Sequence, residues 1–96
     1  MTKAEQVKVI KKKIKFEIGF LNEQIKKRNE AKEELKNCSI EESQAKQSNL
    51  DRCYDALNNQ YMYLCGVLAV AHDLDLISMD KYSEIRKQVF AKVIDS

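Results

Sequence analysis

Residues 7–25 read VKVIKKKIKFEIGFLNEQI, with a large apolar side chain at nearly every third or fourth position. On a helix, which turns by about 100° per residue, these positions form one stripe, a pattern typical of an amphipathic helix packed against a neighbour. Thr2 and Glu5 precede the stripe with the spacing of a capping box, in which each side chain binds a free amide of the first turn. We therefore predict a first helix over about residues 3–37. The stripe comprises Val7, Ile10, Ile14, Ile18, Leu21 and Ile25.

A second apolar stripe with the same period runs through residues 50–71. Ser39 and Glu42 form a second capping box, so the chain should turn near Cys38 and begin a second helix over about residues 40–73. A turn there places residue i opposite roughly residue 76 − i, because antiparallel helices advance by equal steps in opposite directions. Under that register the two stripes face one another, which predicts an antiparallel helical hairpin. The second stripe comprises Leu50, Cys53, Tyr54, Leu57, Tyr61, Leu64, Leu68 and Ala71.

Ser78 can cap a third helix over about residues 79–94. Ile77, directly before this cap, can pack on Tyr82 as a hydrophobic staple. The stretch 26–49 offers few apolar side chains, so we expect it to project as a polar, coiled-coil-like tip, while the third helix packs at the opposite, apolar end. The predicted fold is a single all-α domain comprising the whole sequence, with a three-helix bundle at one end.

The composition suits helices and disfavours other classes. Of 96 residues none is proline and two are glycine, whereas turn-rich β proteins need both. The first 36 residues carry a net charge of +5 and the remaining 60 carry −3, and opposite charge favours pairing of the first helix with the second. We find no signal-peptide pattern, and the longest apolar run, Tyr61–Ala71, is too short for a bilayer, which needs about 20 residues. We expect a soluble protein without membrane association.

The sequence contains three cysteines, Cys38, Cys53 and Cys65. An odd number without C-x-x-C spacing argues against a disulfide scaffold or a zinc site and indicates a reducing compartment, the cytoplasm. A metal site at His72, the only histidine, would have to use Cys65 and the neighbouring Asp73 or Asp75, which is no metal-ligand pattern. Cys65 could be activated as a nucleophile only by His72. We therefore predict no enzyme activity, no metal and no cofactor.

Each long helix carries a second apolar set, which on the first helix points about 140° away from the stripe. Two interpretations are open: the third helix covers both sets, or they form an exposed patch for dimerisation or partner binding. The third helix has one main apolar arc and can fill one groove, which favours the second interpretation. The sets are Val9, Phe16 and Phe20 on the first helix and Ala56, Tyr63, Val67 and Val70 on the second.

Lysines form a ridge on the first helix, between its two apolar sides and about 27 Å long. Such a ridge could follow a phosphate backbone or meet an acidic protein surface. Alternatively it is a solvated face, since nucleic-acid binders usually carry more arginine and a stronger net charge. The lysine ridge comprises Lys8, Lys11, Lys12, Lys15 and Lys26.

Residues 72–86 read HDLDLISMDKYSEIR. This run resembles the short helical hairpin of SHOCT-type domains, in which an apolar helix leads through a small turn and an Ile-Ser/Thr cap into a tyrosine-bearing helix. Asp75 stands where those domains usually have glycine. The resemblance implies self-association or peptide binding and no catalysis. The general pattern is also similar to that of small helical proteins of bacteriophages and mobile elements.

These observations together predict a non-enzymatic protein-binding module. We expect a small oligomerising adaptor, regulator or inhibitor, with a protein partner and a homo-oligomeric state. The alternative is a nucleic-acid-associated protein that uses the lysine ridge. Salt distinguishes the two, because phosphate contacts weaken steeply as salt rises whereas an apolar interface does not.

Overall fold

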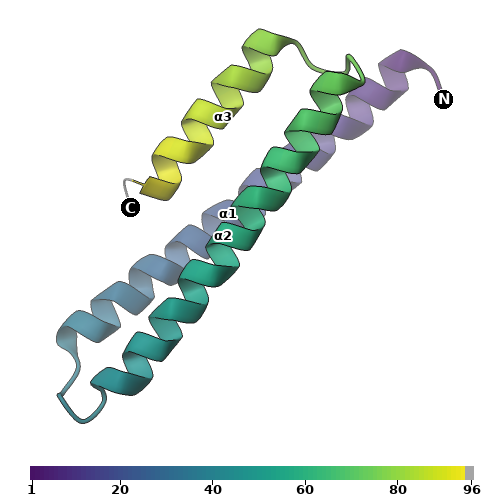
Figure 1. Ribbon diagram of the computed structural model, residues 1–96. Coiled ribbons are helices and arrows are strands. Elements are labelled where there is room, and N and C mark those ends of the chain that lie inside the picture. Colours follow the sequence, from purple (N-terminus) through teal and green to yellow (C-terminus); the bar gives the residue numbers. More distant parts are fainter. Residues whose placement is uncertain (95–96) are drawn as a thin grey trace.

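The computed structural model describes residues 1–94, which form three α-helices. α1 spans Lys3–Asn37, α2 spans Ser43–Asp73 and α3 spans Met79–Ile94. α1 and α2 form a long antiparallel hairpin, and α3 folds back along it from the end at which the N-terminus lies (Figure 1). The predicted all-α hairpin with a short third helix is confirmed.

The core lies where the three helices meet. Its members on α1 and α2 all come from the two predicted stripes, and α3 adds side chains from its own apolar arc. Leu21, Leu57, Leu64 and Leu68 are fully buried, and each such burial contributes about 1.5–3 kcal/mol. The core consists of Ile14, Leu21, Leu57, Leu64, Leu68, Ala71, Ile77, Ile85 and Val89.

Side-chain caps begin two of the helices as predicted. Thr2 Oγ1 accepts a hydrogen bond from the backbone N–H of Glu5, at 3.1 Å, at the start of α1. Ser78 Oγ accepts one from the N–H of Lys81, also at 3.1 Å, at the start of α3. Ile77 is buried beside this cap, and Tyr82 packs against the same core cluster. These caps satisfy amides that lack partners within the helix.

The predicted start of the second helix, at residue 40 with a Ser39–Glu42 capping box, is wrong. α2 begins at Ser43, and Glu42 at its N-cap makes no side-chain capping hydrogen bond. Residues 39–42 form a tight turn, in which the N–H of Glu42 donates to the carbonyl of Ser39 at 3.2 Å. The hydroxyl of Ser43 donates to the carbonyl of Ile40 at 2.7 Å. Carbonyl groups of the turn thus accept these hydrogen bonds, and α2 starts three residues later than predicted.

The connection from α2 to α3 contains a residue with a left-handed backbone conformation. Asp75 has a φ of 58°, in the left-handed region that glycine adopts more readily. Around it, the N–H of Leu76 donates to the carbonyl of Ala71 at 2.8 Å, and the N–H of Asp75 donates to that of His72 at 3.0 Å. These two bonds form a Schellman motif, which ends α2 and turns the chain back toward α3.

The prediction of a solvated tip over residues 26–49 is wrong for the part nearest α3. Arg28 is only 3% exposed, and its Nη1 donates to the carbonyl of Val93, at 2.7 Å, near the end of α3. Ala31, the next stripe position, is also buried. A guanidinium at this place satisfies a carbonyl that the helix end leaves without an internal partner. Beyond it the tip is solvated as expected, since Ile40 is 93% exposed.

Candidate partner-binding face

The second apolar sets of α1 and α2 lie on the same side of the hairpin. The three α1 residues stand four before, three after and seven after Lys13, spacings that place them on the side of α1 that carries Lys13. The Nζ of Lys13 lies 5.2 Å from the centre of the Tyr63 ring on α2. We call this side the open face; its members are Val9, Phe16 and Phe20 on α1 and Tyr63, Val67 and Val70 on α2.

α3 packs against the opposite side of the hairpin, so it does not cover the open face (Figure 1). Phe16 is 69% exposed and Phe20 is 46% exposed. Val9, Tyr63 and Val70 are exposed as well, whereas Val67 is half-buried and packs against the core. The interpretation in which the third helix covers both apolar sets is therefore wrong.

A shallow groove of about 440 Å³ runs along the open face between α1 and α2. Large apolar side chains and the Lys13 stem form its walls, and Gly66 leaves a gap in the α2 wall. The phenylalanines of α1 lie outside the groove, nearer the hairpin tip. The open face thus combines projecting aromatic rings with a depression. The groove is lined by Ile10, Lys13, Tyr63, Gly66, Val67 and Val70.

A buried polar network crosses the hairpin beneath the open face. The side-chain amide of Gln60 on α2 donates to Glu17 Oε2 at 2.7 Å and to the Glu17 carbonyl at 3.2 Å. The other carboxylate oxygen, Oε1, pairs with Lys13 Nζ at 3.0 Å. Both oxygens of a side chain that is almost fully buried are therefore partnered, which removes most of the penalty for burying them.

This network shifts the pKa values of two of its members. Hydrogen bonding from Gln60 lowers the pKa of Glu17 below its ordinary value of 4.5; burial opposes the shift and Lys13 adds to it. The pKa of Lys13 is raised, first by hydrogen bonding to Tyr63 and then by Glu17. The folded state therefore favours the charged forms of Glu17 and Lys13.

We predict an acid-dependent loss of stability that originates at Glu17. Because folding lowers the pKa of Glu17, its charged form contributes stability above about pH 4.5, and this contribution is lost as the pH falls through the folded-state pKa. Denaturant unfolding between about pH 7 and 3 should show a shallower pH dependence for Glu17→Gln than for the parent. Glu30→Gln, at an exposed site on the same helix, is the matched control. Equal slopes for the two variants would contradict the prediction.

Sequence reasoning missed this network, although a signal was present. Glu17 follows Ile14 by three residues and precedes Leu21 by four, so it occupies a position on the buried stripe. Gln60 has the same relation to Leu57 and Leu64 on α2. The hairpin register places these two polar residues opposite one another. Two polar residues at facing stripe positions are the pattern that predicts a buried pair.

All five members of the lysine ridge are exposed. Two of them, Lys11 and Lys15, border a groove of about 450 Å³ between α1 and α3, and Lys81 of α3 stands on its other side. The floor of this groove is built from isoleucines of both helices. The structure therefore brings a further lysine, from a distant part of the sequence, to the ridge.

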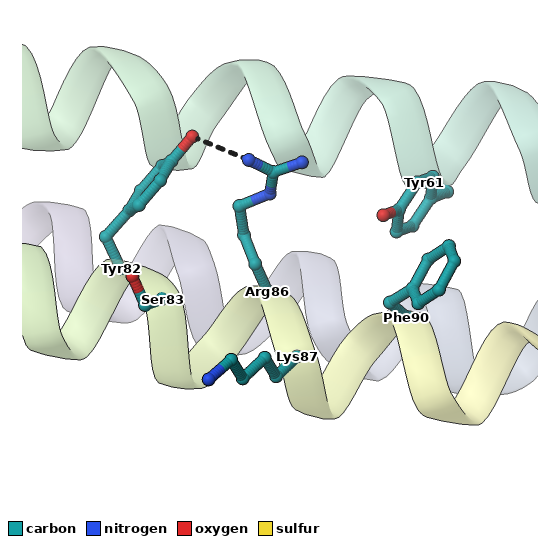
Figure 2. Close-up of a pocket in the computed structure, with 6 residues that line it drawn as sticks. All are labelled: Tyr61, Tyr82, Ser83, Arg86, Lys87 and Phe90. Carbon is teal, nitrogen blue, oxygen red and sulfur yellow. Dashed lines mark hydrogen bonds between the residues drawn. The ribbon is translucent and has the colours of Figure 1, made fainter.

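A third depression lies between α2 and α3. Figure 2 shows Tyr61 of α2 facing Phe90 of α3, with ring centres 6.2 Å apart. Arg86 Nη1 donates to the hydroxyl of Tyr82 at 3.2 Å (Figure 2). Burial is the main cause that raises the pKa of Tyr61. The Tyr61–Phe90 contact packs α3 against α2 on the side away from the open face.

His72 lies in the last turn of α2, where the helix dipole favours a basic group, and its ring centre is 5.3 Å from that of Tyr82. Within residues 1–94, no three histidine, cysteine or acidic side chains gather closely enough to hold a metal ion. None of the described helices has both the length and the apolar character needed to cross a membrane. Comparison with family models, curated proteins and solved structures finds no match to this chain.

Proposed function

We propose that this chain is a non-catalytic protein-binding module that self-associates through the open face and acts as a small adaptor, regulator or inhibitor. The observation that supports it is the exposure of Phe16 and Phe20 beside Tyr63 on a face that α3 leaves uncovered. Burying a phenylalanine gains about 1.5–3 kcal/mol, and small domains are stable by only about 5–15 kcal/mol. A partner surface on this face would recover energy that the monomer forgoes.

Light scattering coupled to size exclusion tests the self-association. At tens of micromolar we expect at least twice the monomer mass of 11.2 kDa. The mass should change little between low and high salt, because the open face is mainly apolar. A monomer mass throughout this range would refute self-association through this face.

Two further features agree with this proposal. The resemblance of residues 72–86 to SHOCT-type hairpins points to peptide binding or self-association. The three cysteines, Cys38, Cys53 and Cys65, are free thiols in the structure, and we propose a cytoplasmic, reducing location on that basis.

Association with nucleic acid through the lysine ridge is the second candidate function. Lys81 favours it, because it adds a positive charge from α3 beside Lys11 and Lys15. Phosphate contacts would then follow the α1–α3 side of the molecule and leave the open face free.

For this second candidate we predict that the triple variant Lys8→Glu, Lys12→Glu, Lys15→Glu no longer binds duplex DNA or RNA in gel-shift experiments. At about 50 mM salt electrostatic binding is strong, and it should fall steeply by 200 mM. The open-face variant Phe16→Asp is the control and should retain binding. If the parent protein retains no nucleic acid at 50 mM salt, this function is excluded.

A further inference from the structure

Gly66 lies in the interior of α2, where the fold gives no reason for a glycine. A glycine within a helix is less favourable than alanine because its backbone loses more freedom on folding. A Cβ atom added at Gly66 would meet no atom within 4 Å, so nothing inside the chain requires the small residue. Gly66 lines the groove of the open face. An open helical glycine in an apolar groove is suited to close approach by another chain.

The open face carries both parts of a self-complementary contact. Phe16 and Phe20 project from α1, and the groove at Gly66 lies at the level of Ile10 and Lys13. The two phenylalanines and the groove are thus separated along the helix axis by about six residues, or roughly 10 Å. A two-fold axis at the midpoint between them, near Ile14, would bring the phenylalanines of each copy to the groove of the other. Such an axis is what an isologous dimer requires.

We propose that a second copy of this chain docks antiparallel on the open face, with Phe16 and Phe20 of each copy entering the partner's groove and packing over Gly66. This inference rests on the proposed function and specifies its geometry. Because Gly66 has no side chain, an aromatic ring or a helix backbone can approach α2 more closely there than at any other residue of the groove.

The exposed aromatic rings of the open face supply about half of the area that such a dimer needs. The exposed parts of the Phe16, Phe20 and Tyr63 rings offer about 330 Å² per copy, taking about 200 Å² for a whole aromatic side chain. Both copies together thus contribute roughly half of the 1,200 Å² at which specific interfaces begin. The two exposed valines, the lysine stems and the helix surfaces around them are added to that.

The polar network beneath the face is compatible with burial in the centre of this interface. Glu17 and Gln60 lie near the level of the proposed axis, and Lys13 stands on the groove wall. Since Lys13 already pairs with Glu17 and lies over the Tyr63 ring, a second copy would cover a charge that has partners. A buried charge without a partner would oppose docking strongly, whereas the pairing with Glu17 offsets part of the cost of removing Lys13 from water.

Gly66→Ala tests this geometry, with Gly19→Ala as the matched control. Gly19 is also a helical glycine with no atom within 4 Å of an added Cβ, but it lies on the lysine-ridge side of α1, outside the groove. Dissociation constants are measured by sedimentation equilibrium. We expect Gly66→Ala to raise the constant by about tenfold or more, because the methyl group overpacks the contact. Gly19→Ala should leave it within about twofold.

Stability is measured separately, in the Phe16→Asp background, where association is removed. There both alanine variants should raise the thermal midpoint by a few degrees, since alanine is the better helix former. A lower midpoint for Gly66→Ala would show that the fold itself needs the glycine, and would overturn the inference.

Failure of self-association and failure of the Gly66 contact give different results. If the parent protein is a monomer, self-association through the open face is wrong and the dimer geometry falls with it. If Phe16→Asp dissociates the protein but Gly66→Ala does not weaken it, the open face is an interface and only the contact at Gly66 is refuted.

Discussion

Phe16→Asp is expected to convert the oligomer into a folded monomer, and Phe20→Asp should do the same. Phe16 is the most exposed aromatic side chain of the open face, at 69%. Its replacement removes the burial of a phenylalanine, worth about 1.5–3 kcal/mol, and places a carboxylate in an apolar interface. Together these effects should raise the dissociation constant at least about a hundredfold, which corresponds to about 2.8 kcal/mol. Light scattering and sedimentation report the mass, and circular dichroism reports the helices.

Ile40→Asp is the matched control for this experiment. It makes the same exchange of a large apolar side chain for an aspartate, at a residue that is 93% exposed in the turn between α1 and α2. This turn lies at the far end of the hairpin from α3 (Figure 1). Ile40→Asp should therefore leave mass and fold unchanged. If Phe16→Asp and Phe20→Asp also leave the mass of an oligomer unchanged, the interface lies elsewhere.

Leu64→Ala should cause a large loss of stability. Leu64 has no exposed surface and belongs to the core shared by all three helices. Truncating a buried leucine costs about 2–5 kcal/mol through lost burial and the cavity left behind. For a domain of this size each kcal/mol lowers the thermal midpoint by about 4–8 °C. Thermal or urea unfolding in the monomeric Phe16→Asp background measures the effect without a contribution from dimerisation.

Met62→Ala, two residues away on the same helix, provides the comparison. Met62 is 68% exposed and is not part of the core, so its truncation should change the free energy of unfolding by less than about 0.5 kcal/mol. Equal losses for Leu64→Ala and Met62→Ala would mean that the packing of α2 differs from the one described.

The hairpin register was accessible from the sequence, because each stripe is a local pattern. The predicted pairing places residue 17 opposite about residue 59, and in the structure Glu17 bonds to Gln60. The caps at Thr2 and Ser78 were equally local signals and are confirmed. The late start of α2 was not predictable from its capping box, since the turn before Ser43 uses donors that the box assigns to a helix.

The residues of the candidate site were also visible in the sequence, but not their shared position. Helical periodicity alone separated Phe16 and Phe20 from the buried stripe, and likewise Tyr63 and Val70. Whether these two sets lie on one side of the hairpin depends on how α1 and α2 are rotated toward each other. The contact between Lys13 and Tyr63 shows that side. The polar network at Glu17 was not predicted. A single charged residue within an apolar stripe has the same spacing as an exposed neighbour of that stripe, and only its position opposite Gln60 identifies it.

The sequence by itself determined the three helices, the place of the reversal and the pairing of the two stripes, because these follow from contacts repeated every three or four residues. Only the tertiary structure decided which side of the hairpin α3 covers. A helix with one apolar arc can occupy either groove of a two-helix hairpin. The choice rests on contacts between distant residues, such as Arg28 with Val93, and on the left-handed turn at Asp75. By occupying one side, α3 leaves the other as the open face.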